Sequence, residues 1–169
     1  MGRNIEIKAR CHDLNTFEDQ LKRLAVQFEG EDAQTDTFFT VPEGRLKLRE
    51  SQLYGNFLIP YVRSDQKGPR PADYSLIPLE DVEKVKGLLS SILGVKGFLR
   101  KIRRIYLYEN VRIHIDQVED LGTFIELEAV VSKSDDEGVS RNKIDRLLEY
   151  FNIEDDDLIA KAYIELKGI

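Results

Sequence analysis

Charged side chains recur at every second position in several short stretches of this 169-residue chain. The clearest stretches are 4–10, 45–49, 112–116 and 124–128. Side chains of a β-strand point alternately to its two faces, so each stretch would have one charged face and one aliphatic face. With two further stretches, the charged face gathers nine basic and four acidic residues: Lys8, Arg10, Arg45, Lys47, Arg49, Arg63, Lys101, Arg103 and Arg112 against Glu6, Asp116, Glu126 and Glu128.

This charge distribution predicts a site for a polyanion that binds together with a metal ion. The basic residues outnumber the acidic ones on this face although the whole chain carries a net charge of −6. Lys and Arg neutralise phosphate oxygens, and Arg offers bidentate contacts. Carboxylates would repel the same anion unless Mg²⁺ or Mn²⁺ lay between them. We therefore expect a metal-ligand set on this face: Glu6, Asp116, Glu126 and Glu128.

An antiparallel sheet with one solvated face is the alternative explanation, because it also produces alternation. Two features favour a site. The face is rich in Arg, Lys and Glu rather than in Thr, Ser and Gln, and its carboxylates recur as Glu-x-Glu at Glu126 and Glu128.

The periodicity of the chain predicts about eight strands and four helices. Helical spacing of apolar residues indicates helices at about 14–28, from Pro78 to Ile92, from near Ser140 to Phe151, and in a final stretch at 158–166. Alternation and β-forming residues predict these strands: 4–10, 34–41, 45–50, 57–63, 74–77, 98–108, 111–118 and 122–131. The segment from Ser64 to Pro71, which includes Arg70, is either a loop over the ligand or a plain exposed basic loop.

These elements predict an α+β fold in which an eight-stranded antiparallel sheet closes into a barrel. The strands are aliphatic opposite their charges, so the amphipathic helices can pack outside the sheet. Closing the sheet would place the charges in a polar lumen. A chain that is 41% hydrophobic has enough apolar residues for one core, so we expect a single domain over residues 1–169.

Composition excludes several other classes of function. The acidic chain argues against nucleic acid as a partner. Its one cysteine, Cys11, cannot form an intramolecular disulfide, and Cys11 with His12 lacks the further Cys and His ligands of a zinc site. No stretch reaches the ~20 apolar residues that span a membrane, and no apolar signal segment opens the chain. We therefore expect a cytoplasmic protein with no membrane partner.

An ordered series of motifs along nearly the whole chain resembles the CYTH superfamily. This superfamily comprises the triphosphate tunnel metalloenzymes, including class IV adenylate cyclases and thiamine triphosphatases. No single motif is specific, whereas the order of the series is. The motifs are Asn4–Arg10, Gln34–Phe39, Gly44–Glu50, Leu58–Arg63, Gly68–Tyr74, Lys101–Tyr106, Arg112–Asp116, Leu121–Gly122, Phe124–Glu128 and Ala162–Leu166.

The resemblance implies an eight-stranded antiparallel tunnel that binds a nucleoside or inorganic triphosphate with Mg²⁺ or Mn²⁺. The order and the residues of the motifs are most similar to those of the class IV adenylate cyclase branch. In that branch the ribose 3′-hydroxyl of ATP attacks the α-phosphate and pyrophosphate leaves. Glu6, Lys8 and Arg63 would then be catalytic. The phosphate-binding set would be Lys8, Arg10, Lys47, Arg49, Arg63, Arg70, Lys101, Arg103 and Arg112.

One departure concerns the first residue of the N-terminal Glu-x-Glu-x-Lys motif, which is Asn4 in this chain. An amide oxygen can still coordinate a hard cation, but it brings no negative charge. Three functions stay open from the residues alone: an adenylate cyclase, an inorganic or organic triphosphatase, and a non-catalytic module that binds triphosphate or polyphosphate. The resemblance is also compatible with a homodimer.

Overall fold

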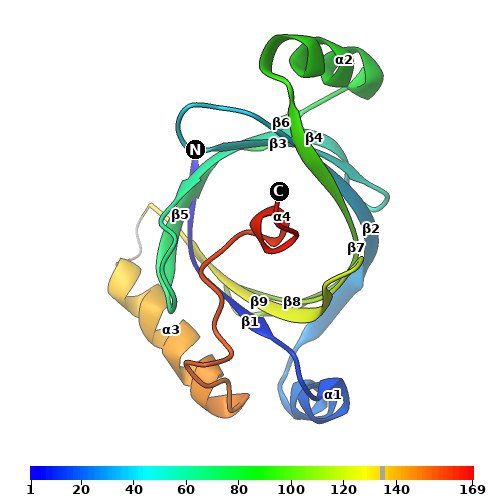
Figure 1. Ribbon diagram of the computed structural model, residues 1–169. Helices are drawn as coiled ribbons and strands as arrows, with labels where there is room; N and C mark the ends of the chain where they lie inside the picture. Colours follow the sequence, from blue (N-terminus) through cyan, green and yellow to red (C-terminus); the bar gives the residue numbers. More distant parts are fainter. Residues whose placement is uncertain (134–135) are drawn as a thin grey trace.

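Eight antiparallel strands close into a barrel in the computed structural model, which describes residues 1–133 and 136–169 (Figure 1). Around the ring the order is β3-β2-β7-β8-β9-β1-β5-β4, and β3 pairs with β4 to close it. A two-residue strand, β6 (Ile77–Pro78), adds to the edge of β4. The barrel strands are β1 Gly2–Arg10, β2 Gln27–Phe39, β3 Arg45–Ser51, β4 Gly55–Arg63, β5 Arg70–Tyr74, β7 Val95–Tyr108, β8 Val111–Val118 and β9 Gly122–Val131. The predicted closed antiparallel barrel is confirmed.

The register of the strands brings the alternating charged residues side by side. On β1 and β9, Glu6 lies opposite Glu128 and Lys8 lies opposite Glu126. On β8 and β9, His114 lies opposite Glu126. Directly opposed residues of an antiparallel pair have Cβ atoms about 5 Å apart, so their side chains interact.

The main hydrophobic core lies outside the barrel, between the sheet and two helices. These are α1 (Leu14–Arg23) and α3 (Glu137–Tyr150). The apolar residues at odd-numbered positions of β1, Ile5, Ile7 and Ala9, pack in one buried cluster with Phe17 of α1 and Ile144 of α3. Strand alternation therefore sends aliphatic side chains outward under the helices, as the sequence predicted for these two elements.

Helix α1 is shorter than predicted. The apolar spacing indicated a helix over 14–28, but the helix ends at Arg23. Phe28 belongs to β2 and lies opposite Tyr106 of β7, because hydrogen bonding to the long strand β7 continues to Gln27. At the start of the helix, the Asp13 carboxylate accepts from the Thr16 backbone N–H at 3.0 Å. Asp13 is therefore the N-cap.

Helix α2 (Val82–Leu93) does not bury the apolar stripe that predicted it. It starts after Asp81, which caps it, rather than at Pro78, which lies in β6. Of its described residues, none is buried, and Leu88 and Ile92 are 54% and 74% exposed. Figure 1 shows α2 standing beside the rim of the barrel near β4 and β6. Helix α2 therefore lies outside the barrel and contacts β2, but most of its apolar stripe is only partly covered.

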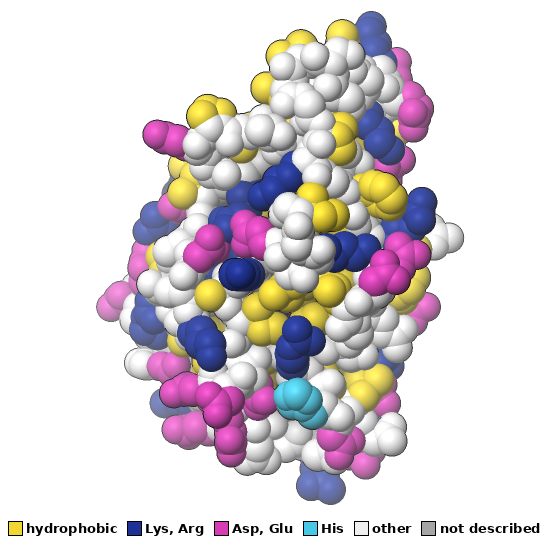
Figure 2. All heavy atoms as spheres, viewed as in Figure 1, with side chains coloured by type: hydrophobic (Ala, Val, Ile, Leu, Met, Phe, Trp, Pro, Cys, Tyr) yellow, Lys and Arg dark blue, Asp and Glu magenta, His cyan; other side chains and the backbone are white. Residues whose placement is uncertain are grey.

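The last helix, α4 (Tyr163–Leu166), is a single turn rather than a helix over 158–166. Figure 1 shows it within the ring of strands, and in the same view the spheres of Figure 2 fill the centre of the ring. Tyr163 and Ile164 join a second buried cluster with Phe38, Leu99 and Phe124. The prediction that all helices lie outside is wrong for α4, which closes one end of the barrel.

Three predicted boundaries differ around the strands. Residues 70–71 lie in β5 rather than in the predicted loop 64–71, and Arg70 is fully buried. The strand predicted at 34–41 runs from Gln27 to Phe39, and the one at 74–77 divides between β5 and β6. The acidic stretch 134–138, which predicts a break between the last long strand and the following helix, lies partly outside the described residues. Within the described part of the chain, no helix has both the length and the apolar character needed to cross a membrane.

Candidate functional site

A cavity of about 500 Å³ occupies the interior of the barrel. Its charged lining contains seven Lys or Arg side chains and five carboxylates, an excess of two positive charges. The cations are all from the predicted phosphate-binding set: Lys8, Lys47, Arg49, Arg63, Lys101, Arg103 and Arg112. The carboxylates are Glu6, Glu29, Asp36, Glu126 and Glu128. Such an excess favours an anionic ligand.

Asp36 pairs with two of these cations and was not among the residues predicted for the site. Arg49 donates to both of its carboxylate oxygens at 2.7 Å, and Lys47 donates at 3.0 Å. Burial opposes ionisation of Asp36, but Arg49 and Lys47 outweigh burial and hold its pKa well below the usual range. Burial lowers the pKa of Lys47 to about 7. Asp36 lies on the inward face of β2, so the alternation of side chains along this strand could have predicted it as a site residue.

Asp116 lies behind the cavity lining rather than at its surface. The carboxylate is fully buried and accepts from Lys101 at 3.0 Å, from Arg103 at 2.6 Å and from the Tyr163 hydroxyl at 2.9 Å. Burial opposes its ionisation, and Arg103 with Lys101 nevertheless keeps its pKa below the usual range. Asp116 was predicted as a metal ligand, but in the structure its carboxylate binds and orients Lys101 and Arg103.

Glu6 and Lys8 of β1 both point into the cavity. Arg63 donates to Glu6 at 3.0 Å. Burial and the nearby Glu128 raise the pKa of Glu6, and Arg63 opposes that rise. Lys8 lies 3.4 Å from Glu126 and 3.8 Å from the centre of the Tyr163 ring, and burial lowers its pKa to about 8. The three residues predicted to be catalytic therefore line the same cavity.

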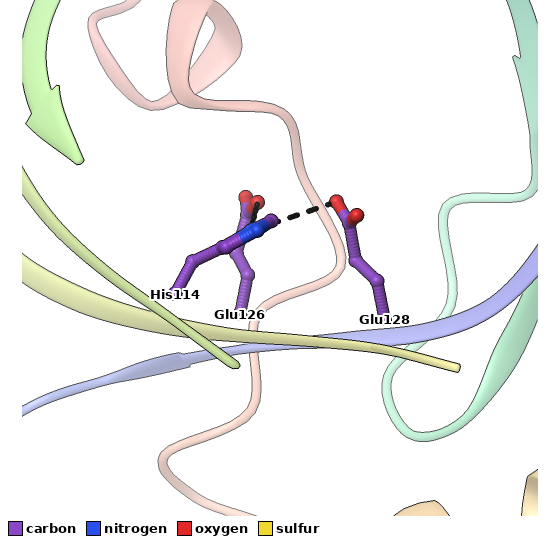
Figure 3. Close-up of side chains that lie close together, drawn as sticks. All are labelled: His114, Glu126 and Glu128. Carbon is purple, nitrogen blue, oxygen red and sulfur yellow. Dashed lines mark ion pairs between the residues drawn. The ribbon is translucent and has the colours of Figure 1, made fainter. Parts of the chain in front are cut away.

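His114, Glu126 and Glu128 form the one group of metal-ligand side chains found among the described residues (Figure 3). One candidate ligand atom from each lies within 4.8 Å of the others. Figure 3 shows the three side chains converging from the sheet. Such a set fits a divalent cation, because two carboxylates supply charge and the buried His114 Nδ1 has no hydrogen-bond partner among the described residues. Glu126 and Glu128 were predicted, whereas Glu6 and Asp116 stand outside this group.

His114 was missed as a candidate ligand, although it shares the inward parity of its neighbours on β8. Its Nδ1 lies 3.9 Å from Glu126 Oε2 and 3.9 Å from Glu128 Oε1, which is too long for a hydrogen bond. Burial lowers the pKa of His114, and Arg103 adds to that effect. Burial thus favours the neutral imidazole, which is the form that binds metals.

Two residues of the predicted phosphate-binding set do not line the cavity. Arg10 is exposed near the end of β1, with its guanidinium carbon 5.2 Å from the centre of the Phe124 ring. Arg70 is buried and donates to the backbone oxygens of Gln66 and Ile159. Burial and nearby Arg63 lower the pKa of Arg70 to about 10. In this structure Arg70 ties the 64–69 loop to the segment before α4.

Asn4 occupies the start of β1, where the motif usually has its first Glu. With its amide oriented to satisfy both groups, its oxygen accepts from Arg112 Nη2 at 3.0 Å and its nitrogen donates to the Arg3 carbonyl at 3.2 Å. Arg112 also contacts Glu128 Oε2 at 3.0 Å. Asn4 therefore orients Arg112 and adds no negative charge to the cavity.

The two ends of the cavity differ in chemistry. The end closed by α4 carries Lys8 and Lys101 beside Tyr163. The strand register places the start of β1 and the end of β5 at the opposite end. Aromatic and aliphatic residues line that part of the cavity: Tyr54, Phe57, Tyr74, Leu76 and Leu107. Tyr54 and Leu76 are each 51% exposed, so they belong to its rim.

Comparisons with known proteins agree with this architecture. The CYTH domain model matches residues 2–163. A protein of Methanocaldococcus jannaschii named "Putative adenylate cyclase MJ0240" is 32% identical, with 98% of each chain covered. The solved structure of the PH1012 protein from Pyrococcus horikoshii has a TM-score of 0.83 at 23% identity, over 96% of this chain and 98% of that one.

A third comparison is with a protein of Hippeastrum, "Putative adenylyl cyclase HpAC1", whose structure is described as revealing a dominant triphosphatase activity. It has a TM-score of 0.57 at 14% identity, over 96% of this chain and 91% of that one.

A closed barrel that gathers cations and paired carboxylates inside defines a tunnel protein suited to anions. This chain belongs to the CYTH domain family. Proteins of that family are generally divalent-metal-dependent enzymes that act on triphosphates.

Proposed function

We propose that this protein binds ATP with Mg²⁺ or Mn²⁺ inside the barrel and converts it to cyclic AMP and pyrophosphate. The observation that carries the proposal is the convergence of seven cationic side chains with Glu126 and Glu128 in one cavity. Such a site can neutralise a triphosphate chain, and the carboxylates can share a divalent ion with it. The name of the relative from Methanocaldococcus jannaschii also supports this choice.

The two ends of the cavity suit the two parts of a nucleotide. The end near α4, with Lys8 and Lys101, suits the phosphates. The aromatic rim at Tyr54 and Phe57 suits a nucleoside, because a base can stack on aromatic rings. An inorganic triphosphate would leave this rim unused. The apolar rim is therefore the feature that favours a nucleotide substrate.

The proposed chemistry relies on positioning and charge. A bound divalent ion would neutralise charge that develops on the phosphates. Glu6 is suited to accept the proton of the ribose 3′-hydroxyl while the 3′-oxygen bonds to the α-phosphorus and pyrophosphate leaves, because burial raises its pKa and makes its carboxylate a stronger base. Arg63, which donates to Glu6 at 3.0 Å, orients that carboxylate. Lys8 would contact phosphate oxygens.

A triphosphatase is the second candidate, supported by the activity described for the Hippeastrum protein. It would use the same cavity with water as the nucleophile on the terminal phosphate. Phosphorus NMR separates the candidates when purified protein receives ATP, tripolyphosphate or thiamine triphosphate with Mg²⁺ or Mn²⁺. Pyrophosphate with cyclic AMP would establish the cyclase, and orthophosphate would establish a triphosphatase. Tight binding without turnover would refute both and leave a binding module.

Glu126→Gln provides the matched test of the site. An enzyme should lose turnover by about 100-fold or more, since a carboxylate that contacts the ion is gone. A module that only binds the anion should bind tripolyphosphate as well or better, because one negative charge leaves the cavity. Glu31→Gln is the control, since Glu31 is exposed on β2 and does not line the cavity. Its turnover should match the unaltered protein.

A further inference from the structure

The buried imidazole of His114 has no structural role that accounts for its Nδ1 atom. The side chain is 5% exposed, and Nδ1 has no hydrogen-bond partner among the residues the structure describes. A buried polar atom without a partner destabilises the folded state, so such an atom calls for an explanation. The atom points between Glu126 and Glu128, at 3.9 Å from one oxygen of each (Figure 3).

Both carboxylates are already held by cations, Glu128 through the oxygen that does not face His114 and Glu126 through the oxygen that does. Arg103 donates to Glu126 Oε2 at 2.5 Å, and Arg112 contacts Glu128 Oε2 at 3.0 Å. These contacts fix the orientation of the two carboxylates towards His114. At 3.9 Å, the two carboxylate oxygens are too far from His114 Nδ1 for a hydrogen bond. The separation leaves room for an ion between the nitrogen and the two oxygens.

We propose that His114 Nδ1 is a nitrogen ligand of the divalent ion, and that it makes the site prefer Mn²⁺ to Mg²⁺. The proposal rests on the metal dependence of the proposed function but concerns which ion is bound. Mg²⁺ strongly prefers oxygen ligands, whereas imidazole readily binds transition-metal ions. With Asn4 uncharged and committed to Arg112, the neutral nitrogen of His114 completes a set that has only two carboxylates.

The direct test is the electron spin-echo spectrum of Mn²⁺ bound to the whole chain, with and without tripolyphosphate. Nitrogen coordination produces a ¹⁴N modulation, which should change to the ¹⁵N pattern when the protein carries ¹⁵N-labelled histidine. The chain has two histidines. His12 is the control, because its side chain is 71% exposed and pairs with Asp157 away from the cavity. His12→Gln should keep the nitrogen signal.

His114→Asn supplies the second measurement, because an amide can place oxygen near the position of Nδ1 and so replaces a nitrogen ligand by an oxygen ligand. Titration calorimetry with Mn²⁺ and with Mg²⁺ gives the ratio of the two affinities. We expect that ratio to fall about tenfold in His114→Asn and to stay unchanged in His12→Gln. Circular dichroism establishes that each variant is folded.

Three outcomes would overturn the proposal: Mn²⁺ bound without nitrogen modulation, an unchanged affinity ratio in folded His114→Asn, or no Mn²⁺ binding even with tripolyphosphate. If His114→Asn fails to fold, the labelled natural chain still decides the question. The spectrum needs no turnover. A nitrogen signal in a protein that converts no triphosphate would therefore refute the enzyme and leave the ligand assignment standing.

Discussion

Replacing Asp36 with Asn should lower the free energy of unfolding by about 3–5 kcal/mol, because it removes one partner of a buried ion cluster. The Asp36 side chain is 2% exposed and accepts from Arg49 at 2.7 Å and from Lys47 at 3.0 Å. Asparagine keeps one acceptor oxygen and turns an N–H group towards the cations. Arg49 cannot lose its charge in a protein, whereas Lys47, with a pKa of about 7, can. Release of that proton places the expected loss near the lower end of the range.

Urea unfolding followed by circular dichroism measures this loss. Asp73→Asn is the matched control, since Asp73 also binds an arginine through both oxygens, at 2.6 Å and 2.7 Å, but at the surface. Exposed pairs contribute little, so the control should lose only a small fraction of what Asp36→Asn loses. Equal losses in the two variants, or a loss below about 1 kcal/mol in Asp36→Asn, would refute the reasoning.

Acid should reduce the difference between the natural chain and Asp36→Asn. The pKa of Asp36 is depressed in the fold, so its stabilisation is present above the unfolded value of about 3.9 and is lost as pH falls below it. Tripolyphosphate should also restore stability to the variant, because the released Lys47 and Arg49 can bind phosphate and ligand binding stabilises the folded state. A difference that stays constant from pH 7 to pH 3 would contradict the ion-cluster account.

Two further predictions concern the buried lysines and the glycines of α2. Burial lowers the pKa of Lys8 to about 8 and that of Lys47 to about 7, and bound phosphate favours their protonated forms. Affinity for tripolyphosphate should therefore fall by up to about tenfold per lysine and pH unit between pH 7 and 9, and calorimetry showing a constant affinity would contradict this. Gly94→Ala should lower stability by about 1 kcal/mol, because Gly94 has φ +76°. Gly87→Ala, inside α2 with open space around the added Cβ, should raise stability by about 0.5–1 kcal/mol. A higher melting temperature for Gly94→Ala, or a lower one for Gly87→Ala, would contradict the corresponding expectation.

The ionic partners of a charged residue depend on contacts with neighbouring strands rather than on the pattern along its own strand. Asp116 shares the parity of Glu126, and both were predicted as metal ligands. Asp116 is enclosed by Lys101, Arg103 and Tyr163, whose hydroxyl comes from 47 residues further along the chain. His114 lies directly opposite Glu126 only because β8 pairs with β9 in this register. Single-strand periodicity contains no information about such partners.

Local propensity also failed where tertiary contacts compete with it. Residues 24–28 continue the apolar spacing of α1, but hydrogen bonds to β7 draw Gln27 and Phe28 into β2. The stripe on α2 predicted burial, but none of the described residues of α2 is buried, and Leu88 and Ile92 are exposed. The final stretch, 158–166, enters the ring and contains one helical turn, where Tyr163 packs on Phe124.

The sequence by itself determined the inward and outward faces of the strands, because alternation of side chains is a property of the extended backbone. That periodicity was enough to predict the barrel and to bring Lys8, Arg49 and Arg103 into one cavity. Only the tertiary structure decided strand register, closure of one end by α4, and the meeting of His114 with Glu126 and Glu128. These features depend on contacts between residues far apart in the chain, and a local sequence pattern does not show how strong such contacts are.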